Sequence, residues 1–169
     1  KWSSDKATVG EEVTLSVNIQ SQQGLRGGVQ FKIYADGADP KIDPPVATKS
    51  VRKDKGLAEV KWRYQYIPGD EPLTEKPKFF FEAWAFRCEK VKSGLVEMGA
   101  KFETLLQDPF HGILADHKYK LTIPGTDFAR EGTSDSDGKV KEKDLPPGKF
   151  EIAPVYEENN GTAAGVFEE

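Results

Sequence analysis

The alternation of apolar and polar residues along much of the chain constrains its fold more than any other feature. Segments 13–19, 29–35 and 58–66 each place an apolar residue at every second position, and the last is nearly perfect. Successive side chains of a β-strand point to opposite faces, so this period predicts strands with one face in a core and the other in water. No stretch of useful length shows the helical period.

The remaining segments of the first half differ in how much of each strand is expected to be buried. Residues 78–87 are apolar on both faces for much of their length, which predicts a central strand. Residues 46–51 are shorter, more polar and preceded by prolines, so we expect an edge strand there. A last short strand is expected at 95–98. Trp62 and Phe81 lie in strongly apolar strands, and we expect both to be buried.

The second half repeats this pattern of short strands and turns. Strands are expected at 102–107, 118–123, 128–133, 139–142 and 149–155, with glycine or proline turns between most of them. Turn signals about every 8 to 12 residues are typical of antiparallel sandwiches. We therefore predict an all-β protein of two antiparallel β-sandwich domains, residues 1–99 and 100–169, with the seam near 99–101. Residues 157–169 are expected to be a loose tail or a last edge strand.

Charge and hydropathy exclude several classes of function. The 24 basic and 28 acidic residues are interspersed, so no basic stripe suggests a nucleic-acid partner. No segment has the roughly 20 apolar residues needed to cross a bilayer, and the polar start of the chain lacks a signal-peptide core; we expect a soluble chain without membrane insertion. The single cysteine, Cys88, excludes an internal disulfide. The oligomeric state is left open.

Four motifs of the second half carry a family resemblance. They are Tyr119-Lys-Leu121, Arg130-Glu-Gly132-Thr133, Asp135-x-Asp-Gly138 and Leu145-Pro-Pro-Gly148-Lys-Phe150. Their order resembles the transthyretin-like, or carboxypeptidase-regulatory-like, β-sandwich, and in particular the modules attached to spike proteins of type VI secretion and other phage-tail-like contractile injection systems. The first half, with its segments 9–13 and 58–62, is similar to the immunoglobulin-like modules found near them.

This resemblance implies an immunoglobulin-like domain followed by a transthyretin-like domain. It also implies a non-enzymatic, protein-binding adaptor that links cargo or a neighbouring component to a bacterial injection apparatus. Such an adaptor would assemble in the cytoplasm and be exported through the apparatus, and an extracellular location is the alternative. Fold does not dictate function, so the role rests on analogy.

Two groups of residues have the elements of a metal site. Asp135 and Asp137, followed by Gly138, have the start of a calcium-loop spacing, and Asp144 stands where the bidentate ligand belongs. Asp in place of Glu and the absence of flanking helices favour instead a turn in which aspartates cap backbone amides. His111 and His117, with Asp108 and Asp116, could hold zinc, but their spacing matches no known ligand pattern. We expect no metal and no cofactor.

Candidate covalent chemistry is sparse. Cys88 lies near the basic residues Arg87 and Lys90, but no hydrolase motif surrounds it and we expect a packing or inert surface residue. The resemblance to adhesin sandwiches, which can join a lysine of the first strand to an asparagine of the last, implies one possible isopeptide bond from Lys101 to Asn159 or Asn160.

Three functions therefore compete. The first is protein binding through strand edges and the 108–117 loop, with Phe110, His111 and His117 as contact residues; Phe110 itself is expected to be tucked inward rather than offered to a partner. The second is a surface carbohydrate-, peptidoglycan-binding or adhesin module, which would use Trp62, Tyr64, Tyr66, Trp84 and Phe86 as a platform, although aromatic residues at this period are more often core. The third is a hydrolase in which His111 and His117 converge on a pocket.

Overall fold

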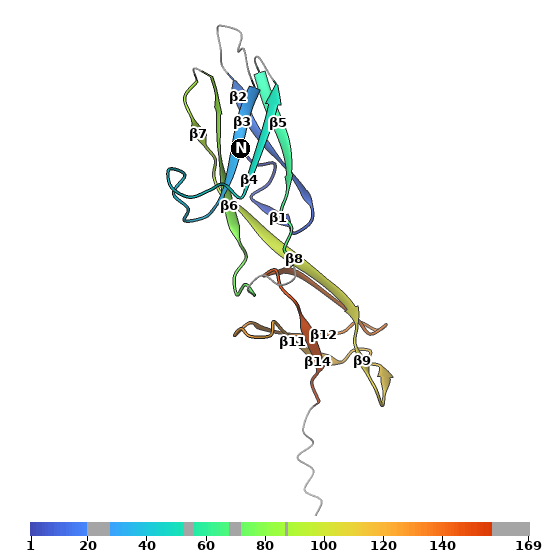
Figure 1. Ribbon diagram of the computed structural model, residues 1–169. Helices are drawn as coiled ribbons and strands as arrows, with labels where there is room; N and C mark the ends of the chain where they lie inside the picture. The colour runs from blue at the N-terminus through green and yellow to red at the C-terminus, as the bar shows by residue number, and fades with distance from the viewer. Residues whose placement is uncertain (20–27, 53–55, 68–71, 87, 157–169) are drawn as a thin grey trace, which may run out of the picture.

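The protein is all-β, as predicted, in the part of the chain that its computed structural model describes, residues 1–19, 28–52, 56–67, 72–86 and 88–156 (Figure 1). Its strands are β1 (Lys6–Thr8), β2 (Glu12–Ile19), β3 (Gly28–Ala35), β4 (Ala47–Arg52), β5 (Gly56–Arg63), β6 (Lys78–Ala85), β7 (Val91–Lys92), β8 (Val96–Leu105), β9 (Gln107–Asp108), β10 (Gly112–Ile113), β11 (Lys118–Thr122), β12 (Ala129–Thr133), β13 (Lys139–Leu145) and β14 (Glu151–Pro154). These residues include no helix that is long and apolar enough to cross a membrane.

Two sheets enclose the first core. The larger has the order β1-β8-β6-β3-β4, and the smaller pairs β2 with β5 in antiparallel register. The predicted central strand is confirmed, because β6 lies between β8 and β3, and the predicted edge strand is β4. One pairing departs from the purely antiparallel expectation: β1 runs parallel to β8.

The first core is built largely from aromatic residues. Trp62 is 6% exposed and Phe81 is 1% exposed, so both predictions of burial are confirmed. The Trp62 ring lies 5.1 Å from that of Phe79 on the opposite sheet and 5.8 Å from that of Trp2. Offset and edge-on ring pairs at such distances add to the stabilisation that comes from burial.

Strand β8 connects the two halves without a break. We expected separate strands on either side of a seam at 99–101, but β8 spans that seam and continues into pairing with β13 (Figure 1). The reason is visible in the sequence, because apolar residues recur at every second position from Val96 to Phe102. Strand β13 passes close to Gly99, where an added Cβ atom would lie 3.1 Å from the Cα of Asp144. The division into domains 1–99 and 100–169 stays a prediction.

The second core is smaller. Its sheet has the order β12-β11-β14, and its buried side chains are contributed by β11, β13 and the residue that follows β8. Leu121, Val140 and Leu145 are almost fully buried there. At the junction between the halves, the Lys76 ammonium group lies 2.6 Å from Glu97 on β8 and 2.9 Å from Asp144 on β13.

Candidate protein-binding surface

The predicted loop 108–117 begins as a small hairpin that presents Phe110. Strands β9 and β10 pair antiparallel, and the turn between them carries Phe110 with 90% of its surface exposed. The expectation that Phe110 is tucked inward is therefore wrong. The physical reason is the tightness of the turn: the Asp108 carboxylate accepts hydrogen bonds from the backbone amides of Phe110 and His111, at 2.7 and 3.0 Å. In this structure the apolar ring of Phe110 remains in solvent.

The Asp108 carboxylate is the centre of this hairpin. One oxygen accepts the two backbone amides and lies 2.9 Å from Nδ1 of His111, and the other accepts a hydrogen bond from the Tyr156 hydroxyl. These bonds hold the pKa of Asp108 well below its usual range, with the Tyr156 hydroxyl as the largest cause and the Phe110 amide next. A carboxylate with this many donors fixes the turn without help from a core.

Both predicted histidines lie beside Tyr156. The ring of His117 is 5.2 Å from that of Tyr156, and the ring of His111 is 6.2 Å away. Sequence reasoning missed Tyr156, because it lies far along the chain from Asp108 and no local motif marks it. The backbone of His117 is held by Ser134, whose hydroxyl accepts the His117 amide at 3.0 Å and donates to the carbonyl of Leu114 at 2.6 Å.

The hydrogen bonds of the two imidazoles bear on whether they belong to a nucleophilic site. His111 is oriented by a carboxylate, but in the described part of the chain no serine, threonine or cysteine side chain is hydrogen-bonded to either imidazole. Nucleophilic catalysis needs such a contact. The described residues also contain no group of three or more His, Cys, Asp or Glu side chains that could hold a metal ion.

The second candidate metal site is a turn. The Asp135 carboxylate accepts the backbone amides of Asp137 and Lys139 at 2.9 and 2.8 Å, and Asp137 pairs with the Lys139 ammonium group at 3.1 Å. Asp144 is directed to Lys76 instead. The interpretation of 135–138 as an aspartate-capped turn agrees with this geometry. The turn also packs closely against the hairpin, because a Cβ atom on Gly138 would lie only 2.3 Å from the Ile113 side chain.

The aromatic residues considered for a sugar platform do not share one face. Trp62 and Tyr64 pack between the two sheets with Phe79. Trp84 lies on the outer face of β6, where the ammonium groups of Lys32 and Lys90 are 5.1 and 5.8 Å from its ring centre. The isopeptide hypothesis involves Asn159 and Asn160, which lie outside the described residues, and Lys101 pairs with Glu11 at 2.7 Å.

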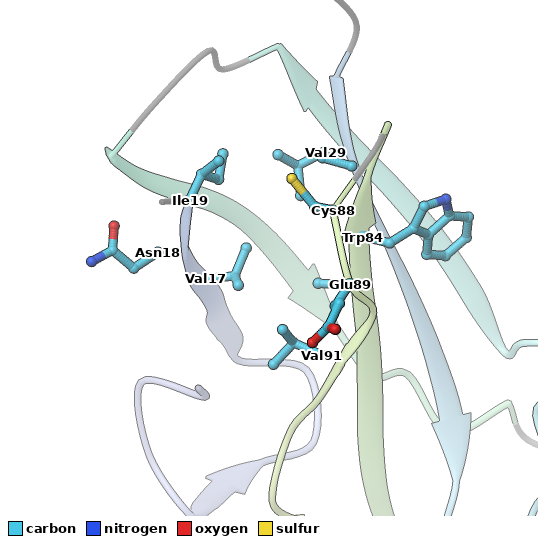
Figure 2. A pocket seen from close by; sticks show the side chains of 10 residues that line it. Val17, Asn18, Ile19, Val29, Trp84, Cys88, Glu89 and Val91 are labelled. Carbon is cyan, nitrogen blue, oxygen red and sulfur yellow. The ribbon is translucent and has the colours of Figure 1, made fainter. Parts of the chain in front are cut away.

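A pocket of about 100 Å³, lined by aliphatic residues together with Asn18, Cys88 and Glu89, opens where the two sheets of the first core separate (Figure 2). One wall is the end of β2, residues 17–19, and the other is formed by β6 and residues 88–91. Cys88 is exposed at this pocket, and Arg87 lies outside the described residues. No histidine lines the pocket, so the histidines and the pocket are separate features.

Comparison with known proteins assigns no family to the chain. No family model and no curated protein matches the chain. Among solved structures, the chain is similar to a variant of BcpA, the major pilin subunit of Bacillus cereus, at 14% identity and a TM-score of 0.30. The match covers 94% of this chain and 59% of the pilin chain, so this protein spans less than two thirds of the pilin's length. A likeness this distant assigns neither family nor function.

Proposed function

We propose that this chain is a non-enzymatic protein-binding module that uses the β9–β10 hairpin as its contact surface. The observation that carries the proposal is the exposure of Phe110 at the tip of a turn whose shape is already fixed. Binding sites between proteins commonly concentrate their free energy in a few aromatic or arginine anchors. Full burial of a phenylalanine side chain contributes about 1.5 to 3 kcal/mol.

The turn is organised before any partner arrives. Asp108 holds the amides on both sides of the tip, and Tyr156 holds Asp108 from the far end of the described chain. A fixed anchor loses little conformational freedom when it binds, and this raises affinity without any additional contact. Polar and aromatic surface surrounds this anchor. It comes from the His111 side chain, which is 66% exposed, and from the His117 ring beside Tyr156.

The finer proposal, an adaptor for cargo or a neighbouring component of a bacterial injection apparatus, rests only on the resemblance of the second half. The hairpin is compatible with that role and with any other that requires docking on a protein. A carbohydrate-binding or adhesin role and a hydrolase role are treated as outcomes of the test below.

The test places a photo-crosslinking group at the anchor. Phe110 is replaced by p-benzoylphenylalanine, the variant is added to an extract of the producing organism, and adducts formed on irradiation are identified by mass spectrometry. We expect a defined protein adduct that an excess of unmodified wild-type chain suppresses and an excess of the Phe110→Ala chain does not. The matched control carries the same group at Ile42, which is 79% exposed on a different loop.

Three results would contradict the proposal. Equal adducts from positions 110 and 42 would show nonspecific contact. Retention of the chain by glycans or peptidoglycan, unchanged in Phe110→Ala, would favour the carbohydrate-binding role. Hydrolysis of ester or amide substrates that is lost in His111→Ala would favour an enzyme.

A further inference from the structure

One side of the second core is bordered by two open strand edges. In the part of the chain that the structure describes, β14 pairs only with β11, and from Lys101 onward β8 pairs only with β13. The ring centres of Phe102, on β8, and Phe150, just before β14, lie 5.4 Å apart. Beyond the other ends of these strands, the Tyr156 hydroxyl donates to the Asp108 carboxylate. The two contacts are met in the same order along both segments, so β8 and β14 run in the same direction along this side.

The open edge of β14 presents a defined set of backbone groups. The Val155 amide donates to the Lys118 carbonyl at 2.8 Å, so Val155 faces β11. Hydrogen-bonding groups of a strand alternate between its two edges, and Ile152 and Pro154 therefore face away from β11. Within the described ranges no backbone group pairs with either residue on that side. Ile152 offers an amide and a carbonyl there, and Pro154 offers a carbonyl alone.

The second core is incompletely covered along β14. Phe150 and Ile152 pack against this core but are only partly buried, whereas Leu121 and Val140 are almost fully buried. A core this small buries little apolar surface, so each further contact matters more than it would in a large domain. An additional strand along β14 would pair its open groups and cover these side chains.

The sequence that follows β14 has the features of a hairpin loop and a returning strand. Residues 157–169 lie outside the described residues, and only their sequence enters the argument. A three-residue hairpin loop commonly ends in a residue with a left-handed backbone, for which glycine is suited. Asn159-Asn160-Gly161 has this form. Residues 162–167 contain threonine, valine and phenylalanine, which are common in strands, and no proline.

A hairpin with this loop has the register that the open edge requires. With 159–161 as the loop, Val166 lies opposite Pro154 and Glu168 lies opposite Ile152, so the outward-facing residues of β14 occupy hydrogen-bonding positions. A two-residue loop at 160–161 would instead engage Val155, which already bonds to β11. In the three-residue register the Val166 side chain is on the same face of the sheet as Ile152, toward the core.

We infer that residues 162–168 add to the open edge of β14 as a further antiparallel strand of the same chain. Pairing within the chain closes only a short loop, whereas a strand from a second copy adds the cost of association. The inference is independent of the proposed function, because it concerns β14 and not the β9–β10 hairpin. With its edge filled, β14 cannot accept a partner's strand, and docking then relies on the hairpin.

The first test is hydrogen exchange of single amides in the purified 169-residue chain, followed by NMR. We expect the Ile152 amide to be protected, as that of Val155 is through its bond to β11. Val166→Pro removes the amide that faces the Pro154 carbonyl, and it should accelerate exchange at Ile152 at least about tenfold. Val166→Thr keeps the amide and suits a strand, so this matched control should leave the protection of Ile152 unchanged.

The second test fixes the register by disulfide formation. In a Cys88→Ser background, which removes the single native cysteine, Ala153→Cys is combined with Phe167→Cys. These positions form a non-hydrogen-bonded pair in the inferred register, with Cα atoms about 4.5 Å apart, which is within disulfide range. We expect mild oxidation to join them within one chain, as shown by non-reducing electrophoresis and peptide mass spectrometry. Ala153→Cys with Val166→Cys, on opposite faces, is the control and should stay reduced.

Unprotected exchange of the Ile152 amide in the unsubstituted chain would overturn the inference, and so would equal oxidation of the two cysteine pairs. A disulfide between two chains at positions 153 and 167 would also overturn it, because the added strand would then come from a second copy. The exchange measurement on the unsubstituted chain needs no variant, so a cysteine pair that prevents folding does not remove the test.

Discussion

The two halves of this molecule reach their folds by different means. The first core contains fifteen buried residues among those described, with rings in contact from Trp2 to Tyr64, whereas the second contains five. Small cores bury too little apolar surface to specify loops by packing alone. The second half instead fixes its chain with side-chain hydrogen bonds: the carboxylates of Asp108 and Asp135 accept backbone amides, and the Ser134 hydroxyl donates to a backbone carbonyl. These side-chain hydrogen bonds form the polar framework of the second half, and they also hold the β9–β10 hairpin in place.

The largest effect on this comparison is expected from Trp62→Ala. The substitution leaves a cavity beside Trp2 and Phe79, and large-to-small changes of this kind cost about 3 to 5 kcal/mol of unfolding free energy. Denaturant unfolding followed by circular dichroism measures the loss. Trp84→Ala on the outer face of the sheet is the matched control and should cost clearly less. Equal losses would mean that the first core does not depend on its inward-facing rings.

Leu121→Ala should have the next largest effect, and in the second half. Leu121 is fully buried in the small core, and the expected loss is about 2 to 4 kcal/mol. Because few other apolar residues support that core, we expect amide exchange to accelerate across β11, β12 and β14 while β3 and β6 remain protected. Hydrogen exchange with mass spectrometry distinguishes the halves, and uniform acceleration would show that they unfold as one unit.

Tyr119 tests the polar framework. Its hydroxyl donates to Glu142 at 2.6 Å, and burial, followed by this bond, raises its pKa to about 12. An unfolded tyrosine titrates near 10, so the folded state retains the proton longer, and this contribution is present below about pH 10 and lost as the pH rises to 12. Tyr119→Phe should cost about 1 to 2 kcal/mol at neutral pH. It should also flatten stability between pH 10 and 12, measured by urea unfolding, and an unchanged pH slope would refute the assignment.

Lys76→Met should have the smallest effect and concerns the junction between the halves. The substitution removes the pairs with Glu97 and Asp144, and partly exposed ion pairs contribute about 0.2 to 1 kcal/mol. The pKa of Asp144 is lowered, first by its hydrogen bond to Lys76. The contribution is therefore present above the ordinary carboxyl pKa and lost as the pH falls below it. Thermal melts at pH 3 and pH 7 should differ less in Lys76→Met than in the parent, and Lys49→Met, at an exposed position of β4, is the control.

Local sequence predicted most strands, because a period of two depends only on which residues are apolar. The expected break between strands at 99–101 was wrong, because the alternation of apolar residues continues through that segment and β8 follows it. Local sequence also failed at Phe110, since no local pattern shows that Asp108 holds the turn outward or that Tyr156 holds Asp108. For the three predicted contact residues, Phe110, His111 and His117, the sequence indicated the segment that contains them but not how their side chains are arranged.

The sequence by itself determined the fold class, the buried aromatic residues and the central and edge strands, because these follow from hydrophobicity and from backbone preferences within each segment. Only the tertiary structure decided that β8 serves both cores, that Tyr156 joins the two histidines, and that Asp108 holds the turn that exposes Phe110. Each of these depends on contacts between residues far apart in the chain. Such contacts are set by how complete sheets pack, and the residues of one segment do not encode them.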